Sequence, residues 1–335
     1  MQGHRKAKNL SSFPGSAAAI DVAKLYNLAG EQYARYADGD PDRLFSFDGL
    51  HGYADRQSWE VLERKLNELR AEGKGAIRIL DAGCGPGTWL RRCVTHAHRL
   101  GFTQIAARGF DLAEAQIETA RRNAADLAAL PGVDLNFEVA DLTTLLPEGD
   151  ASVDLTICLY SVLGHLPVAL LPRVVMELAR VTRGCLVATV RPVGSMPTAF
   201  VDAVEKVRYL KLDNTHDRCE IELTNGRRMS LSFHLFRIEE LRHCFDRHFD
   251  IEDLRGLDIF HSRFSPDRRW NPTCLAPDRH IMASLAAMEE AHSRDPHFIE
   301  HAMHLLLVGR PRAGRATGFA SGLTGIKASG PRKAA

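Results

Sequence analysis

The sequence has almost no net charge, no disulfide pattern and no long apolar run. Its 335 residues include 43 Lys and Arg against 42 Asp and Glu, a net charge of +1 at pH 7. No strong overall field therefore points to nucleic acid or to acidic membranes. The balance hides an asymmetry, because residues 1–10 and 309–335 hold nine basic residues and no acid, which leaves 34 basic against 42 acidic residues between them.

The seven cysteines are odd in number, scattered and free of any CxxC pair. Several lie in apolar runs, so we expect reduced thiols rather than disulfides or a zinc site. The N-terminus lacks the apolar core of a signal peptide. The most apolar window, Leu155 to Leu171, is interrupted by Gly164, His165 and Pro167 and is shorter than the roughly 20 residues of a membrane span. We expect a cytoplasmic protein.

The chain is predicted to have disordered ends around a folded body. An apolar fraction of 45% and a charged fraction of 25% are typical of soluble globular proteins. Residues 1–16 and 311–335 are rich in Gly, Ala, Ser and basic residues, and such segments bury too little apolar surface to fold. A solvated tail is favoured for 311–335 over a nucleic-acid arm. Residues 17–72 are expected to form a helical lid and residues 73–310 the main domain.

Short β-rich runs alternate with helical patterns through the body, which predicts an α/β fold with a mostly parallel sheet. The helical patterns cover Ala113–Leu130, Leu170–Val181 and Ile238–Arg247. The strand candidates are Ile77–Asp81, Gln104–Phe110, Leu135–Val139, Leu155–Leu159, Cys185–Arg191, Asp250–Leu254 and His304–Val308.

Three segments depart from this alternation and are expected to cover the open end of the sheet. Arg218–Leu235 alternates apolar residues around Asn225-Gly226, which predicts a β-hairpin. Ser262–Pro296 lies between the last two strands. Ala17–Ala37 and Arg56–Ala71 look helical and precede the first strand.

The strongest local signal is the run from Ile77 to Thr88, in which a strand ends in Asp81 and enters a glycine-rich turn. Such turns let a ligand approach the backbone, at the strand ends where open α/β sheets bind ligands. Thr88 stands where a dinucleotide fingerprint would need glycine, and no phosphate-binding Lys follows. The turn suits a nucleoside-like ligand with a cationic amine.

These residues, with others that follow in order, resemble the class I S-adenosylmethionine (SAM)-dependent methyltransferases, in particular the Rossmann-like small-molecule type, over most of residues 70–310. The matching motifs are Leu80–Gly87, Gly109–Ala113 (with Asp111 at 24 residues after Gly87), Val139–Leu142, Val153–Pro167, Glu177–Gly184, His234–Leu241, Phe249–Glu252 and Leu305–Gly309. The resemblance implies a Rossmann-like three-layer sandwich whose seven-stranded sheet has an antiparallel last strand.

The resemblance also implies a cofactor site for SAM, whose product is S-adenosylhomocysteine. Asp111 would accept hydrogen bonds from the ribose hydroxyls, a charge-assisted contact; its alternative role is a helix N-cap. Asp141 would take the adenine amino group, or be a surface acid. Asp81 would help hold the methionine amino group, or cap the glycine turn. The further cofactor residues are Gly83, Cys84, Gly85, Gly87, Leu112, Leu142 and Leu159, the leucines being alternatively plain core.

Candidates for the acceptor side come from the ends of strands and from the lid. His165 and Tyr160 could assist catalysis, with His165 the better base on its ordinary pKa, although a structural histidine is slightly favoured. The run Tyr26–Tyr36 resembles the lid helix of small-molecule methyltransferases, in which Tyr33 and Tyr36 could close over the sulfonium or be core aromatics. Arg191 could bind an acidic acceptor or belong to a solvated basic loop. A metal site has no support, because His301 and His304 lack accompanying ligands.

The function predicted from these features is methyl transfer to a small molecule by in-line displacement. The acceptor atom, O, N or C, is left open. A macromolecular methyltransferase recruited to RNA by its basic tail and a non-catalytic SAM-binding regulator are the alternatives. A nicotinamide-dependent dehydrogenase is least favoured, because of Thr88.

Overall fold

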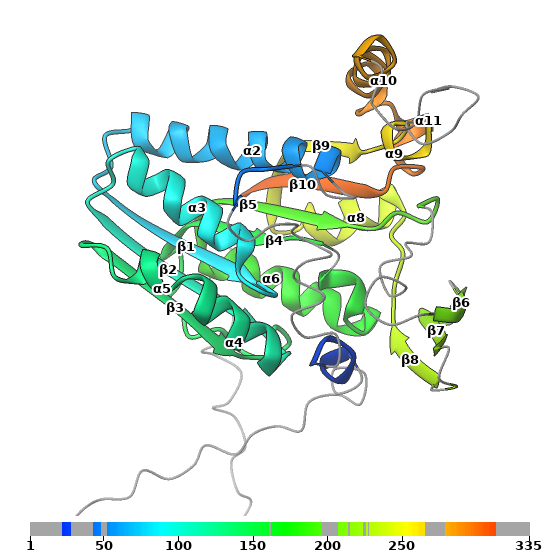
Figure 1. The fold of residues 1–335 in the computed structure, drawn as a ribbon, viewed down its shortest axis with the longest axis horizontal. Coiled ribbons are helices and arrows are strands. Elements are labelled where there is room, and N and C mark those ends of the chain that lie inside the picture. The colour runs from blue at the N-terminus through cyan, green and yellow to red at the C-terminus, as the bar shows by residue number, and fades with distance from the viewer. Residues whose placement is uncertain are drawn as a thin grey trace, which may run out of the picture.

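A seven-stranded sheet forms the centre of the computed structural model, which describes residues 22–27, 43–47, 52–160, 162–195, 207–213, 215–223, 226, 228–264 and 279–312. Helices lie on both faces of the sheet (Figure 1). Its strands are β1 Ala76–Ala82, β2 Gln104–Asp111, β3 Val133–Val139, β4 Val153–Cys158, β5 Thr182–Val190, β9 Phe249–Leu257 and β10 His304–Pro311. All seven predicted strands are present, with ends that differ by up to three residues.

The strand order is β3-β2-β1-β4-β5-β10-β9. Neighbouring strands from β3 to β5 pair in parallel, with Ile79 of β1 opposite Ala107 of β2 and Leu155 of β4. Strand β10 runs antiparallel to both β5 and β9. The predicted fold class, with an antiparallel last strand, is confirmed.

Alternating strand residues supply two separate cores. Ile77 and Ile79 face a core shared with α2 (Gly52–Ala71), α3 (Thr88–Arg99) and α4 (Glu114–Asn123). Leu80 and Ala82 face a second core shared with α6 (Leu171–Val181) and α8 (Ile238–Phe245). This follows from the period of two in a strand. The two cores pack on opposite faces of β1 and so fix the position of the glycine turn at its carboxyl end.

Two predicted helices have different bounds. The helix expected over Ala113–Leu130 is divided into α4 and α5 (Ala125–Ala128) at Ala124. The first part buries Ile117 and Ala120, whereas α5 has no fully buried residue, so packing supports only the first part as a regular helix. Helix α2 begins at Gly52, four residues before the predicted start.

A small three-stranded sheet of order β6-β7-β8 stands apart from the main sheet. The predicted hairpin is confirmed as β7 (Arg218–Leu223) and β8 (Arg228–Ser232), and a third strand, β6 (Val207–Asp213), was not predicted. Helical residues 22–27 pack on this sheet through a separate core of Val22, Leu25, Cys219, Leu231, Phe233 and Leu235.

The connection from β9 to β10 contains α9 (His261–Phe264), α10 (Arg279–His292) and α11 (Pro296–Ile299). Because β10 is antiparallel to both β5 and β9, strand β9 runs in the same direction as β5 and β1. The connection that follows β9 therefore lies at the same end of the strands as the glycine turn. The predictions for Tyr33, Tyr36, Asn225, residues 1–16 and residues 313–335 lie outside the described residues. Five of the six described cysteines are buried and all six are free thiols. In the described part of the chain, no helix combines the length and hydropathy of a membrane span.

Candidate cofactor and methyl-transfer site

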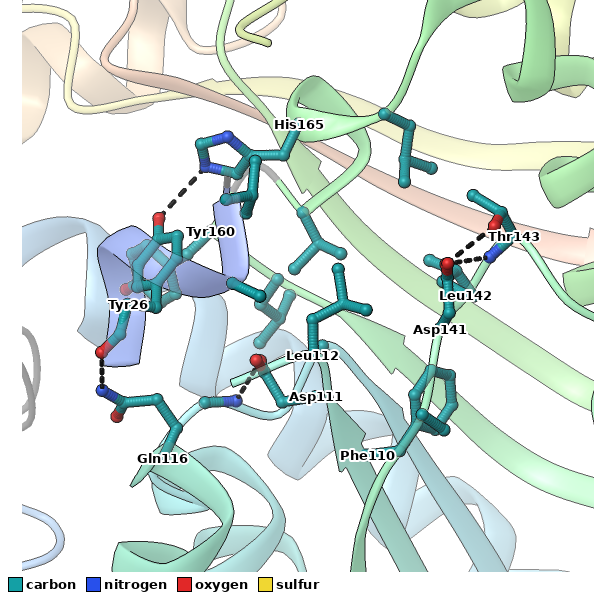
Figure 2. Close-up of a pocket in the computed structure, with 18 of the residues that line it drawn as sticks. Tyr26, Phe110, Asp111, Leu112, Gln116, Asp141, Leu142, Thr143, Tyr160 and His165 are labelled. Carbon is teal, nitrogen blue, oxygen red and sulfur yellow. Dashed lines mark hydrogen bonds between the residues drawn. The ribbon is translucent and has the colours of Figure 1, made fainter. Parts of the chain in front are cut away.

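One pocket lies where the carboxyl ends of β1 to β4 meet. It holds about 840 Å³ of empty space, part of which is open to solvent. Residues 22–27 form one wall and the strand ends form the other (Figure 2). Nine predicted site residues line it: Gly83, Gly85, Asp111, Leu112, Asp141, Leu142, Leu159, Tyr160 and His165.

The glycine turn needs its glycines for two different reasons. At Gly87, whose φ is +80°, an added Cβ would lie 2.8 Å from the Phe137 ring and 2.9 Å from Ala120, so this glycine allows close packing. At Gly85, whose φ is +50°, an added Cβ would meet no described atom within 4 Å. Gly85 therefore presents open backbone to the pocket, which is the arrangement a bound nucleoside needs.

The carboxylate of Asp111 links the turn to the second strand. Its Oδ2 accepts a hydrogen bond from Gly85 N at 3.0 Å, and its Oδ1 accepts one from Ala113 N at 2.9 Å. Burial raises the pKa of Asp111, opposed by these backbone hydrogen bonds. The residue at the N-cap of α4 is Ala113, not Asp111. A carboxylate offers about four acceptor positions, so capacity is left for a sugar diol at the pocket.

Apolar side chains flank the part of the pocket between β2 and β4. Leu142 and Leu159 are buried, and Phe110 and Leu112 join them in the lining. Asp141 Oδ1 accepts hydrogen bonds from Thr143 N and Thr143 Oγ1, both at 2.8 Å (Figure 2). An apolar slot with a carboxylate held at its rim suits a purine ring with an exocyclic amine.

The helix formed by residues 22–27 is fastened over the pocket by polar contacts. Asn27 Oδ1 accepts from Ala115 N at 2.9 Å, and the Tyr26 carbonyl accepts from Gln116 Nε2 at 3.1 Å. The Tyr26 hydroxyl lies 3.1 Å from His165 Nε2. Tyr26 and Gln116 line the pocket but were not predicted as site residues. Gln116 lies outside the motifs, and in the run Tyr26–Tyr36 only Tyr33 and Tyr36 were given a role.

Both ring nitrogens of His165 are engaged. Nδ1 lies 3.1 Å from the Ser232 carbonyl oxygen, which can only accept, so Nδ1 holds the proton and Nε2 accepts from the Tyr26 hydroxyl. Burial lowers the pKa of His165 to about 4, with a further lowering by Arg191. The imidazole is therefore neutral at pH 7 and joins the helix of residues 22–27 to β8.

The remaining predicted residues lie farther from the cavity. Asp81 is 2% exposed and Arg191 4% exposed, and neither belongs to the pocket lining. The Arg191 guanidinium lies 5.8 Å from the centroid of the Phe233 ring. Cys84 and Gly87 are buried within the turn behind Gly85. Tyr33 and Tyr36 lie outside the described residues.

Comparisons with known proteins agree with this geometry. Residues 79–184 match the family model described as a methyltransferase domain. No curated protein sequence matches the chain. One similar solved structure is the [4+2]-cyclase SpnF, 18% identical over 89% of this chain and 98% of that one, with a TM-score of 0.50. Another is geranyl diphosphate C-methyltransferase from Streptomyces coelicolor A3(2), 16% identical over 89% of this chain and 99% of that one, with a TM-score of 0.49. Likeness at these identities concerns the fold alone.

The family match covers residues 79–184, about a third of the chain, and describes a methyltransferase domain. The strand order, with its antiparallel last strand, agrees with the fold that the sequence resemblance predicts. The pocket at the carboxyl ends of β1 to β4 has the open backbone and acceptor groups that a nucleoside ligand requires.

Proposed function

We propose that the protein transfers a methyl group from SAM to a small-molecule acceptor bound beside the cofactor. The observation that carries this proposal is the pocket in which Gly85 presents open backbone, Asp111 presents a carboxylate, and residues 22–27 form a wall. A lid of this kind limits access to the reacting group, which favours a small acceptor over a macromolecular one.

The cofactor roles follow the strand order. Asp111 at the end of β2 would bind the ribose hydroxyls, and Asp141 after β3 the adenine amino group, with Leu112, Leu142 and Leu159 against the ring. Asp81 at the end of β1 would serve the amino-acid end, either directly or through water. The main chain from Gly83 through Cys84 and Gly85 to Gly87 would pass along the ligand between these groups.

When bound, SAM supplies a methyl group already activated by a sulfonium. The protein's task is then to hold the acceptor in line, and well-oriented reactants reach effective molarities of about 10⁵–10⁸ M. A base is needed chiefly for a hydroxyl or ammonium acceptor. His165 is neutral, but it would have to release the Tyr26 hydroxyl before taking a proton. Arg191 and the lid residues Tyr33 and Tyr36 stay candidates for acceptor recognition.

Mass spectrometry of a metabolite extract incubated with the protein and SAM tests the proposal. We expect one metabolite to gain about 14 Da (one CH₂) while S-adenosylhomocysteine accumulates, and neither change with the Asp111→Ala variant. Because the fold is shared with a [4+2]-cyclase, SAM binding without any mass gain would instead favour another reaction or a regulatory role.

A further inference from the structure

Two buried hydrogen-bond donors lie next to the pocket, and neither has a partner within the described part of the chain. They are the Tyr160 hydroxyl and Trp89 Nε1. Their ring centroids are 5.8 Å apart, and the His304 ring packs edge-on against Tyr160 at 5.4 Å. A buried donor left without an acceptor is destabilising. Two such neighbours indicate a ligand group that accepts hydrogen bonds from both.

The backbone of Tyr160 is held in an unusual conformation. Its φ is +56°, a left-handed value that is strained for a non-glycine residue, and its N–H donates to Thr189 Oγ1 at 2.6 Å. Tyr160 lines the pocket together with Gly83 and Gly85 (Figure 2). Strain of this kind persists where a side chain must be aimed at a ligand.

The strand order places this pair at one end of the cofactor. Asp141, Asp111, Gly85 and Tyr160 follow β3, β2, β1 and β4, which are neighbours in that order. Strands lie about 4.8 Å apart, so the end of β4 is roughly 10 Å from the end of β2. A ligand with adenine at β3 and ribose at β2 extends its amino-acid part toward β4.

The carboxylate of Asp81, which accepts hydrogen bonds, lies close to these two donors. Asp81 raises the pKa of the Cys93 and Cys158 thiols, so its side chain lies near both α3 and β4. Cys93 is one helical turn from Trp89, and Cys158 is two residues from Tyr160. An acidic side chain beside one N–H donor and one O–H donor matches a ligand that carries an ammonium and a carboxylate on the same carbon atom.

We infer that the Tyr160 hydroxyl and Trp89 Nε1 bind the carboxylate of the amino-acid end of SAM. This inference rests on the proposed function and makes Tyr160 a cofactor-binding residue rather than an acid or base. Trp89 has no place in the sequence motifs, because a tryptophan on the apolar face of a helix is read as core.

The test compares SAM with decarboxylated SAM, which keeps the amine and lacks the carboxylate, by calorimetry on the full chain. The wild type should prefer SAM. Tyr160→Phe and Trp89→Phe should each weaken SAM binding about tenfold or more, the effect of a hydrogen bond to a charged group, and should leave decarboxylated SAM binding unchanged. Tyr53→Phe and Trp59→Phe are matched controls, because both residues belong to α2 and their ring contacts are to Phe45, His96 and His261, whereas Trp89 packs against the pocket residue Tyr160.

A preference for SAM that is the same in both variants as in the wild type would overturn the inference. If Trp89→Phe does not fold, as judged by circular dichroism, the test rests on Tyr160→Phe, because that change removes one oxygen and keeps the ring. The deciding quantity is then the ratio of its affinities for SAM and decarboxylated SAM. A wild type that binds neither ligand would instead contradict the proposed function.

Discussion

The Asp111 carboxylate has acceptor positions for both the protein and the ligand, so its replacement should separate binding from folding. Asp111→Asn keeps the shape but halves the acceptor capacity. We expect S-adenosylhomocysteine affinity to fall about 10- to 100-fold, since hydrogen bonds to a charged group contribute roughly 1.5–3 kcal/mol. Calorimetry measures this, with the exposed Asp126→Asn as the control. Unchanged affinity would refute the ribose assignment.

The low pKa of His165 predicts a loss of stability in acid. A histidine whose folded pKa is about 4 instead of 6.5 binds its proton more weakly when folded. The unfolded chain therefore gains protons first, and stability falls as pH drops from about 6.5 toward 4. We expect a loss of about 2 kcal/mol between pH 7 and pH 5 from this group.

The contribution of His165 is obtained as a difference between two proteins. Urea unfolding of the wild type and of His165→Gln at pH 7 and pH 5 cancels the other titrating groups. The wild type should lose about 2 kcal/mol more than the variant over this range. Equal losses would mean that the pKa of His165 is the same in the folded and the unfolded protein.

At the scale of elements, the glycine turn offers a matched pair of variants. Gly87→Ala places a methyl group against Phe137 and Ala120 at under 3.0 Å, whereas Gly85→Ala places it in the open pocket. We expect Gly87→Ala to lower the unfolding free energy by about 1–3 kcal/mol through overpacking, in addition to the cost of a left-handed backbone that both variants share. Gly85→Ala should cost about 1 kcal/mol for its left-handed backbone and mainly weaken S-adenosylhomocysteine binding. The reverse pattern in thermal unfolding and calorimetry would show that Gly87, not Gly85, faces the ligand.

The helix of residues 22–27 should act as a closure whose hold depends on Tyr26. Tyr26→Phe removes the hydrogen bond to His165 but keeps the ring against it. A typical net hydrogen bond of about 1 kcal/mol predicts roughly fivefold faster dissociation of S-adenosylhomocysteine in stopped-flow measurements. Tyr53→Phe should leave the rate unchanged. A rate unaffected by Tyr26→Phe would mean that this contact does not limit release.

Elements with strong sequence signals were predicted well, and contacts between distant elements were not. The seven strands, the hairpin and the glycine turn follow from local pattern and motif spacing. The third strand β6, the break at Ala124 and the Tyr26–His165 contact across 139 residues depend on packing, which a local pattern does not contain. The same is true of Arg191, which is buried beside Phe233 where residues 191–193 pair with the main chain of Phe236.

At the scale of the whole molecule, the basic C-terminal residues separate a small-molecule enzyme from one that acts on RNA. Strand β10 runs to Pro311, and Arg312 N donates to the His248 carbonyl at 2.9 Å, so a truncation should remove only residues 313–335. We expect the shortened chain to keep the wild-type unfolding midpoint and S-adenosylhomocysteine affinity. The described pocket and sheet do not include the removed residues.

The same pair of proteins tests for an RNA acceptor. Residues 313–335 contain four basic residues and no acid, and each phosphate contact contributes about 0.7 to the logarithmic salt slope of single-strand binding. If the acceptor is small, a 20-nucleotide RNA should bind both proteins weakly and with the same slope between 50 and 200 mM salt. A slope near −3 in the full chain that disappears on truncation, together with methyl incorporation into the RNA, would replace the small-molecule proposal by the macromolecular one.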